Sequence, residues 1–473
     1  MKFSSEAFVS QAVVALNDAE LRRALGKAKG GFVDKRQLAY EGLPEWEQIR
    51  QTAREVKDHT LAHLDYYLER YEEKVTASGG HVHWARNATE AQEIITGICR
   101  QASARAVTKG KSMISEEMGL NEALVAAGME VMETDLGEYI IQLAEEPPSH
   151  IIAPAIHKTK QQITTLFHEH HPQYGLTEPV TEIPDIVNEA RSVLRRAFLS
   201  ADVGITGANF LIAETGSSVI VTNEGNGDLT NTLPDVHIVT ASIDKVIPTL
   251  EDLSNVLRLL GRSATGQEMS SYTTLSTGPK RAQDVDGPSH YHVVLLDNGR
   301  SRLLGGEFRE MLRCIRCGAC LNHCPVYGAV GGHAYGWVYS GPMGSVLTPL
   351  INGLDGARHL PNACTLNGRC EEMCPMSIAL PTLLRKLRKR EYETGLMPPV
   401  TRWALGLWAY VARRPTLYRH LTDLGIALLG RFGKRRGRFG WLPFAGGWTA
   451  SRDMPAPAAQ TFQRAWRRRQ GSR

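Results

Sequence analysis

Apolar residues recur at three- and four-residue spacing through the first 76 residues. The pattern is most regular in EWEQIRQTAREVKDHTLAHLDYYLERYEEKV (residues 45–75), which contains neither glycine nor proline. Spacing of this kind predicts one long helix, and the following SGGH (78–81) predicts its end. The sequence therefore predicts an N-terminal helical region over residues 1–76.

Short apolar runs alternate with helical patterns over residues 77–303. This order predicts an α/β domain with a mainly parallel sheet. Within the longest run, residues 210–222 predict a hairpin that turns at ETGS (214–217). The strand candidates are HVHWA (81–85), AVTK (106–109), EVMETD (130–135), HIIAPAI (150–156), residues 203–223, DVHIVTAS (235–242) and HYHVVLLDN (290–298).

The remaining sequence predicts two further regions. Residues 304–395 carry the cysteine motifs and end in an amphipathic helix pattern, LPTLLRKLRKREYE (380–393). Residues 396–473 are rich in Trp, Arg and Gly, and TRWALGLWAYVARRP (401–415) predicts a helix there. We therefore expect a small cysteine-bearing module followed by a basic C-terminal region.

Charge is distributed unevenly along the 473 residues. The net charge is +4, but the chain from Met376 onward has 20 Lys and Arg against 4 Asp and Glu, whereas the preceding part has 34 against 46. A basic tail of this kind suits an acidic protein partner, a membrane surface or nucleic acid, or it is merely solvated. The clustered cysteines that precede this tail favour a redox partner or a membrane face and make nucleic acid the weakest choice.

Composition sets the expected location. The 42% hydrophobic and 22% charged residues are typical of a globular protein, and no apolar run reaches the roughly 18 residues of a membrane span. The N-terminus lacks the layout of a secretory signal. We expect a cytoplasmic protein, and the basic tail leaves open peripheral contact with the inner face of the membrane.

Seven of the eight cysteines lie between positions 314 and 374. The run Cys314-x2-Cys317-x2-Cys320-x3-Cys324-Pro has the spacing with which bacterial ferredoxins bind 4Fe–4S clusters, and in two-cluster ferredoxins the fourth cysteine of each run serves the other cluster. A second run, CTLNGRCEEMCP (364–375), repeats this spacing with Asn367 in place of one cysteine. Structural zinc typically uses four ligands, and a reducing cytosol disfavours disulfides, so both alternatives fit seven clustered cysteines poorly.

The spacing therefore predicts two clusters with interleaved ligands. Cluster 1 takes Cys314, Cys317, Cys320 and Cys374. Cluster 2 takes Cys324, Cys364 and Cys370, with Asn367 at the usual fourth position. An amide oxygen is a poor ligand for iron–sulfide compared with thiolate, so cluster 2 is expected to be either a cubane with a labile corner or a 3Fe–4S cluster.

Other candidate contacts lie in loops of the α/β domain. Glu214 stands in the predicted hairpin turn, and Lys280 and Arg281 stand in STGPKRAQDVDGP (276–288), a loop long enough to be functional. These three residues are candidates for binding a substrate or an anion. No G-x-G-x-x-G follows a predicted strand, so no nicotinamide or flavin fingerprint is visible, and the sequence identifies no catalytic residue.

The chain resembles the lactate utilisation protein B family, the iron–sulfur subunit of a bacterial L-lactate oxidation system. The resemblance covers nearly the whole chain. The family usually has cysteine at the position of Asn367, and some members also have cysteine at that of Cys364. The residues that carry it are KSMISEEMGLNEAL (111–124), METDLGEYIIQLAEEPPSHIIAPAIHK (132–158), GITGANFLIAETGSSVIVTNEGN (204–226), TGPKRAQDVDGP (277–288), VVLLDNGRS (293–301), LRCIRCGACLNHCPVY (312–327), GGHAYGWVYSGPMGSVLTPL (331–350) and LPNACTLNGRCEEMCP (360–375).

The resemblance implies a fold and a role. The fold is an α/β domain related to ribose-5-phosphate isomerase and CoA-transferases, followed by a two-cluster ferredoxin module. The role is that of the electron carrier, with two companion proteins, in oxidation of L-lactate to pyruvate that allows growth on lactate. Two alternatives remain: the α/β domain itself binds or oxidises a 2-hydroxy acid, or the protein is a scaffold whose basic tail docks an acidic partner. The sequence does not identify the electron acceptor.

Overall fold

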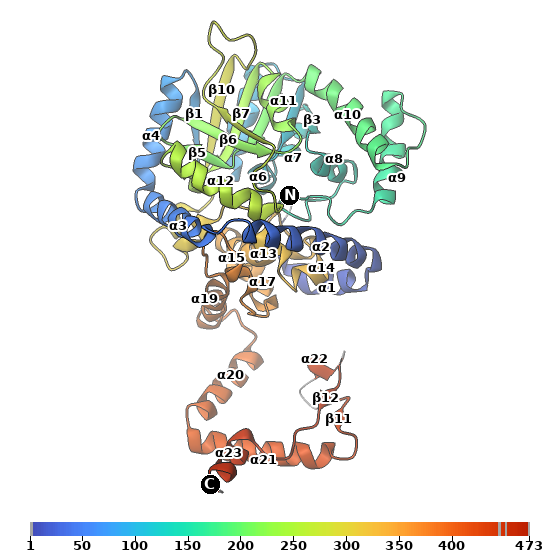
Figure 1. Ribbon diagram of the computed structural model, residues 1–473, viewed down its shortest axis with the longest axis vertical. Coiled ribbons are helices and arrows are strands. Elements are labelled where there is room, and N and C mark those ends of the chain that lie inside the picture. Colours follow the sequence, from blue (N-terminus) through green and yellow to red (C-terminus); the bar gives the residue numbers. More distant parts are fainter. Residues whose placement is uncertain (1–2, 443–445, 450–451, 472–473) are drawn as a thin grey trace. The chain divides into compact units, whose positions relative to one another are not determined.

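The computed structural model describes residues 3–442, 446–449 and 452–471, and divides the chain into two compact units, residues 1–390 and residues 391–473. The first unit contains the α/β sheet, the N-terminal helices and the cysteine-bearing segment (Figure 1). The boundaries that the sequence suggests at residues 76, 303 and 395 stay predictions.

A six-stranded parallel sheet forms the centre of the first unit, as predicted. Its strands lie in the order β1-β10-β7-β4-β2-β3, and every neighbouring pair is parallel. The order places the carboxyl ends of all six strands at one edge, where open α/β sheets bind their ligands. The strands are β1 (His81–Ala85), β2 (Ala106–Gly110), β3 (Glu130–Glu133), β4 (Val203–Gly207), β7 (Val236–Ser242) and β10 (His290–Leu296).

Helices cover both faces of this sheet. Alternation along β10 separates the faces: Val294 and Leu296 pack in the same core as α5, whereas Val293 and Leu295 pack in the same core as α4. Cys99 is fully buried on α5, where it acts as a small apolar residue. The covering helices include α4 (Leu64–Ala77), α5 (Ala88–Gln101), α6 (Met113–Met118), α7 (Leu120–Ala126), α8 (Leu136–Leu143), α9 (Lys160–His170), α10 (Ile183–Ser200) and α11 (Asn226–Thr232).

The predicted hairpin is present but belongs to a second sheet. Strands β5 (Phe210–Ile212) and β6 (Ser217–Thr222) are antiparallel around the ETGS turn. They join β8 (Val246–Ile247) and β9 (Tyr272–Ser276) in a four-stranded sheet of order β8-β5-β6-β9. Helix α12 (Leu250–Ala264) packs against β5 on one side and against the N-terminal helices on the other.

Two local predictions are wrong. The expected single helix over residues 45–75 is broken at His63, whose φ of −129° and ψ of 40° are not helical. The break lets α3 (Trp46–Ala62) pack on α12 while α4 packs on β1. The expected strand at residues 150–156 is a series of turns: Pro154 has no N–H to donate, and His150 Nδ1 accepts hydrogen bonds from the N–H groups of Ile152 and Ala153.

The N-terminal helices join the sheet to the cysteine-bearing segment. Helix α2 (Ala19–Glu41) contacts α12 of the α/β part and α13 and α14 of the cysteine-bearing part, and α1 (Phe8–Asn17) contacts α14 and α17 (Figure 1). One continuous hydrophobic core therefore includes all three regions. The helices of the cysteine-bearing segment are α13 (Ala319–Asn322), α14 (Tyr327–Val330), α15 (Gly341–Asn352), α16 (Leu354–Ala357), α17 (His359–Ala363), α18 (Arg369–Glu372) and α19 (Leu380–Glu393).

The second unit is mainly helical. Its elements are α20 (Pro399–Ala412), α21 (Pro415–Gly433), the antiparallel pair β11 (Arg438–Phe439) and β12 (Met454–Pro455), α22 (Gly446–Thr449) and α23 (Phe462–Gly471). The helix predicted at residues 401–415 is α20 and the start of α21. Across the described residues, no helix combines the length and the apolar character that a membrane crossing requires.

Candidate functional site

The two cysteine runs adopt the same backbone conformation. Arg316 and Gly318 have φ of 60° and 74°, and the matching Leu366 and Gly368 have φ of 55° and 85°. Two left-handed residues bend each loop sharply, and a short helix, α13 or α18, follows each one. The repeat in sequence is therefore also a repeat in structure, in which Asn367 occupies the place of Cys317.

The fold brings the cysteines of the two runs together in interleaved groups. Burial, together with the thiols of Cys374 and Cys314, raises the pKa of Cys317 to about 12. Burial likewise raises the pKa of Cys320 well above its ordinary value, and Cys314 and Cys317 add to the effect. We call Cys314, Cys317, Cys320 and Cys374 the first thiol group.

A second set of thiols lies beside the first. Burial, together with the thiols of Cys364 and Cys324, raises the pKa of Cys370 to about 12. We call Cys324, Cys364 and Cys370 the second thiol group. Cys320 of the first group also interacts electrostatically with Cys370, so the two groups are neighbours. Each group combines cysteines from both runs.

The surroundings of both groups suit iron–sulfur clusters. All seven residues are free thiols, so the structure offers no support for disulfides. Thiols with raised pKa stay protonated unless a metal ion supplies positive charge, and iron bound by thiolates does this. Backbone N–H groups also point at the sulfurs: Ile378 N lies 3.5 Å from Cys374 Sγ, and Leu366 N lies 3.3 Å from Cys364 Sγ. Hydrogen bonds of this kind tune cluster potentials.

The first thiol group lines a small cavity with apolar walls. Its other wall residues include Ile151, from the turn segment that the sequence mispredicted as a strand, and Met343 of α15. Exclusion of water stabilises the lower charge state of a cluster and protects its sulfides. The remaining lining residues are Ile315, Arg316, Gly318, Pro375, Met376, Ile378 and Leu380.

Three arginines from distant helices fix the cysteine loops. Arg36 of α2 donates to the Met373 carbonyl at 3.0 Å, and Arg50 of α3 donates from Nε to the Cys374 carbonyl at 2.8 Å. Arg388 of α19 donates to the Cys364 carbonyl at 2.6 Å. Sequence reasoning missed these residues, since an arginine in an amphipathic helix carries no sign of its partner, which lies more than 300 positions away for Arg36 and Arg50 and 24 positions away for Arg388.

Asn367 differs from Cys317 in its surroundings. Cys317 is buried, whereas Asn367 is exposed. The Asn367 Oδ1 atom accepts a hydrogen bond from the backbone N–H of Arg369 at 3.2 Å, at the start of α18. The amide therefore satisfies a helix-terminal donor in this structure.

The three other predicted contacts do not come together in one pocket. Glu214 accepts a hydrogen bond from the Leu250 N–H at 3.1 Å, at the start of α12. Arg281 is exposed and pairs with Asp284 at 3.1 Å in the long loop, and Lys280 is an exposed neighbour in that loop. None of these three lines the cavity at the strand ends that is described next.

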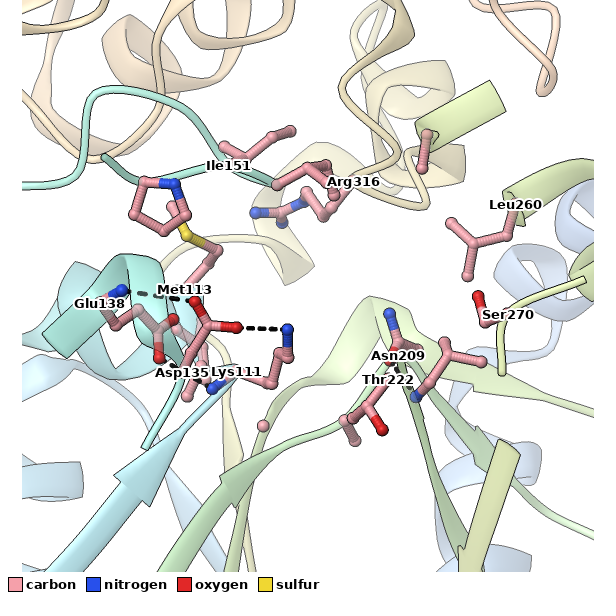
Figure 2. A pocket seen from close by; sticks show the side chains of 18 of the residues that line it. Lys111, Met113, Asp135, Glu138, Ile151, Asn209, Thr222, Leu260, Ser270 and Arg316 are labelled. Atoms are coloured by element: carbon pink, nitrogen blue, oxygen red, sulfur yellow. Dashed lines mark hydrogen bonds and ion pairs between the residues drawn. The ribbon is translucent and has the colours of Figure 1, made fainter. Parts of the chain in front are cut away.

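A cavity of about 270 Å³ lies at the carboxyl ends of β2, β4 and β7 (Figure 2). Lys111 and Asn209 line it just beyond β2 and β4, Ser242 lines it as the last residue of β7, and Arg316 enters from the loop between Cys314 and Cys317. The cavity therefore joins the ligand-binding edge of the sheet to the first thiol group. Ser112, also in its wall, caps the start of α6 by accepting a hydrogen bond from the Ser115 N–H.

A buried ionic network lies beneath the cavity. Arg300 is fully buried; it donates to Glu117 at 2.6 Å and lies 3.1 Å from Asp244. Burial alone would raise the pKa of Asp244, but Arg300 and Arg316 lower it to about 2. Tyr339, near the cysteine runs, donates to Glu117 at 2.6 Å. The network therefore ties β10 and α6 to the segment that holds the thiols.

Comparison with known families agrees with this architecture. Residues 68–296 match the LUD domain, residues 310–378 match the 4Fe-4S dicluster domain, and residues 395–471 match the C-terminal region of lactate utilisation protein B. Together with the clustered thiols, these matches define an iron–sulfur protein in which a LUD domain precedes a dicluster module.

Full-length relatives identify the family. Lactate utilization protein B of Bacillus pumilus (strain SAFR-032) is 42% identical over 473 residues, which cover 99% of each chain. The protein of that name from Bacillus velezensis is 43% identical and covers 98% of this chain and 97% of its own. An uncharacterized electron transport protein, YkgF, of Escherichia coli K12 is 40% identical with the same coverage. The chain belongs to the lactate utilization protein B family, which confirms the resemblance.

Proposed function

We propose that this protein is the electron-carrying iron–sulfur subunit of a system that oxidises L-lactate to pyruvate. The observation that carries the proposal is the interleaving of two adjacent thiol groups in one buried module. The names of the full-length relatives, which refer to lactate utilization and electron transport, supply the metabolic context.

In this proposal the first thiol group holds cluster 1 as a 4Fe–4S cubane, and the second thiol group holds cluster 2. When bound, the clusters supply one-electron carriers. The chain supplies the thiolate ligands, the apolar walls that exclude water and the N–H groups that stabilise charge on sulfur. The electrostatic contact between Cys320 and Cys370 supports an electron path from one group to the other.

The proposal requires partners. Because the chain offers thiol groups and no identified catalytic residue, we propose that one of two companion proteins oxidises lactate. Electrons then leave this chain for an acceptor at a different surface. The cytoplasm is the proposed location. The basic residues of the second unit, including Arg467, Arg468 and Arg469 of α23, suit an acidic surface on a companion protein or on the inner face of the membrane.

Iron and sulfide analysis of the anaerobically purified chain tests the proposal. We expect between about seven and eight iron atoms per chain, and dithionite reduction should produce the EPR signals of two interacting clusters. When the chain is mixed with its companion proteins, L-lactate should reduce its clusters without dithionite. About four iron atoms, or zinc in place of iron, would contradict the two-cluster assignment.

Asn367→Cys is expected to change cluster 2. The substitution places a thiol at the position that Cys317 occupies in the other loop, so a three-ligand site gains its fourth thiolate. If cluster 2 is 3Fe–4S, iron should rise by about one atom per chain and the oxidised-state 3Fe signal should disappear. If cluster 2 is a labile cubane, its half-life in air should lengthen.

Asn367→Asp is the matched control for this substitution. Aspartate keeps a side-chain oxygen to accept from the Arg369 N–H but supplies no thiolate. We expect its iron content and air stability to stay close to those of the unmodified chain. Equal behaviour of Asn367→Cys and Asn367→Asp would place position 367 outside the ligand shell.

A further inference from the structure

Three basic side chains, Lys111, Lys245 and Arg316, line the cavity at the strand ends, and burial and the nearby Arg316 lower the pKa of Lys245 to about 7. Lys111 pairs with Asp135 and, at 3.2 Å, with Glu224, so this cation is already satisfied. Burial and two neighbouring carboxylates raise the pKa of Glu138 well above its ordinary value, which favours its neutral form. The remaining cations in the wall are Lys245 and Arg316.

Asp244 acts electrostatically on both Lys245 and Arg316, but it lies closer to Arg300. Lys245 is nine-tenths buried and makes no hydrogen bond or ion pair with the residues that the structure describes. The Arg316 guanidinium lies over the Tyr339 ring at 4.5 Å, and its nearest carboxylate is Asp244 at 3.9 Å. Its Nε atom is buried without a hydrogen-bond partner. Buried donors of this kind are costly unless a ligand satisfies them.

Neutral polar groups line the opposite wall. Figure 2 shows Asn209 and Thr222 across the cavity from Asp135 and Glu138, with Arg316 projecting toward the space between them. The Thr222 hydroxyl is buried and has no hydrogen-bond partner, although it lies beside the cavity. Met113, Ile114 and Leu260 complete the wall with apolar surface.

We propose that this cavity binds a small organic carboxylate that carries a hydroxyl or keto oxygen on the adjacent carbon. Lys245 and Arg316 hold the carboxylate, because a guanidinium and an ammonium are the groups that pair with it. Asn209 and Thr222 form hydrogen bonds with the second oxygen, and the short carbon chain packs against the apolar wall. About 270 Å³ is at the small end of ligand pockets, which suits an occupant of few heavy atoms.

The proposal deepens the proposed function and rests on it in one respect: the presence of cluster 1 beside the cavity. Arg316 stands between the cluster 1 cysteines Cys314 and Cys317. A bound anion that engages Arg316 therefore changes the electrostatic environment of that cluster. Anion binding by Lys245 and Thr222 does not itself require electron transfer.

Calorimetry on the full chain, with its clusters intact under anaerobic conditions, tests the site. The titrants are L-lactate, pyruvate, propionate and inorganic phosphate. We expect heat with lactate or pyruvate at millimolar concentration, weaker binding of propionate, which lacks the second oxygen, and weaker binding of phosphate. No heat with lactate or pyruvate, or tightest binding of phosphate, would overturn the proposal.

Four variants locate the binding. Lys245→Met removes the cation while nearly preserving volume, and is expected to weaken carboxylate binding by at least about tenfold. Thr222→Val is expected to reduce the preference for lactate and pyruvate over propionate. Lys160→Met, at an exposed lysine where α9 begins, is the matched control and should bind as the unmodified chain does. Unchanged binding in Lys245→Met, or its loss in Lys280→Met instead, would contradict this location.

Two further measurements separate this inference from the proposed function. Iron content and the dithionite-reduced EPR spectrum report the clusters, and both should be retained in Lys245→Met. Saturating carboxylate should shift the EPR signal of cluster 1 in the unmodified chain and leave it unshifted in Lys245→Met. Full iron content with no carboxylate binding would refute the carboxylate site and leave the electron-transfer proposal intact. Carboxylate binding by a chain that holds no iron would support the site and contradict the electron-transfer proposal.

Discussion

Cys317→Ala is expected to abolish lactate-dependent electron transfer and to lower the iron content by about four atoms per chain. Cys317 is buried in the first thiol group, and alanine offers no ligand to replace it. Adjacent water is excluded by the apolar walls and cannot easily take its place. Iron and sulfide analysis measures the first effect, and dye reduction with L-lactate and the companion proteins measures the second.

Cys99→Ala is the control for this prediction. Cys99 is as deeply buried as Cys317, but it lies on α5 in the core of the α/β domain, away from both thiol groups. Its loss should leave iron content and electron transfer unchanged, with a stability cost of about 1 kcal/mol. Full electron transfer in Cys317→Ala would refute the proposed function.

Arg300→Met is expected to destabilise the first unit by about 3–5 kcal/mol. The substitution keeps the volume but leaves the buried Glu117 and Asp244 carboxylates without the cation that lies 2.6 Å and 3.1 Å from them. Glu117 also accepts a hydrogen bond from the Tyr339 hydroxyl, so the destabilisation should extend to the cysteine-bearing segment. The midpoint of denaturant unfolding should fall, and iron should be released at lower denaturant concentration than in the unmodified chain.

A surface pair supplies the comparison. Arg281→Met removes an ion pair with Asp284 that is exposed on the long loop, so its cost should lie within about 1 kcal/mol. Arg300→Met with Glu117→Gln should recover part of the stability, because the double variant leaves one fewer buried charge unpaired. Equal midpoints for Arg300→Met and Arg281→Met would show that the buried network does not hold the unit together.

Local pattern was sufficient for the parts of the fold whose neighbours in space are also neighbours in sequence. The alternation of short apolar runs predicts the parallel sheet because each strand lies beside helices that follow it closely in the chain. The ETGS turn predicts its hairpin because the turn residues carry the geometry themselves. The run at 150–156 failed because Pro154 and the His150 ring make turns more stable than a strand there.

The helix break at His63 shows the limit of such reasoning. Residues 45–75 contain neither glycine nor proline, so no strong helix breaker marks the position of the break. The break exists because α3 and α4 pack on different partners: α3 packs on α12, which lies far away in the sequence, whereas α4 turns back onto β1, which follows it directly. Tertiary packing outweighs helix propensity when the free energy gained by burying apolar surface exceeds the free energy lost with one helical turn.

The sequence by itself determined the cysteine runs, their spacing and the departure at Asn367, because cluster-binding loops are short and their ligands lie two or three residues apart. The tertiary structure alone decided what surrounds them. It brought Arg36, Arg50 and Arg388 to the loop carbonyls, buried Arg300 between two carboxylates, and placed Arg316 in a cavity with Lys245. Hydrogen bonds and ion pairs between separate elements leave no periodic pattern in a sequence, so these contacts can be identified only in the folded chain.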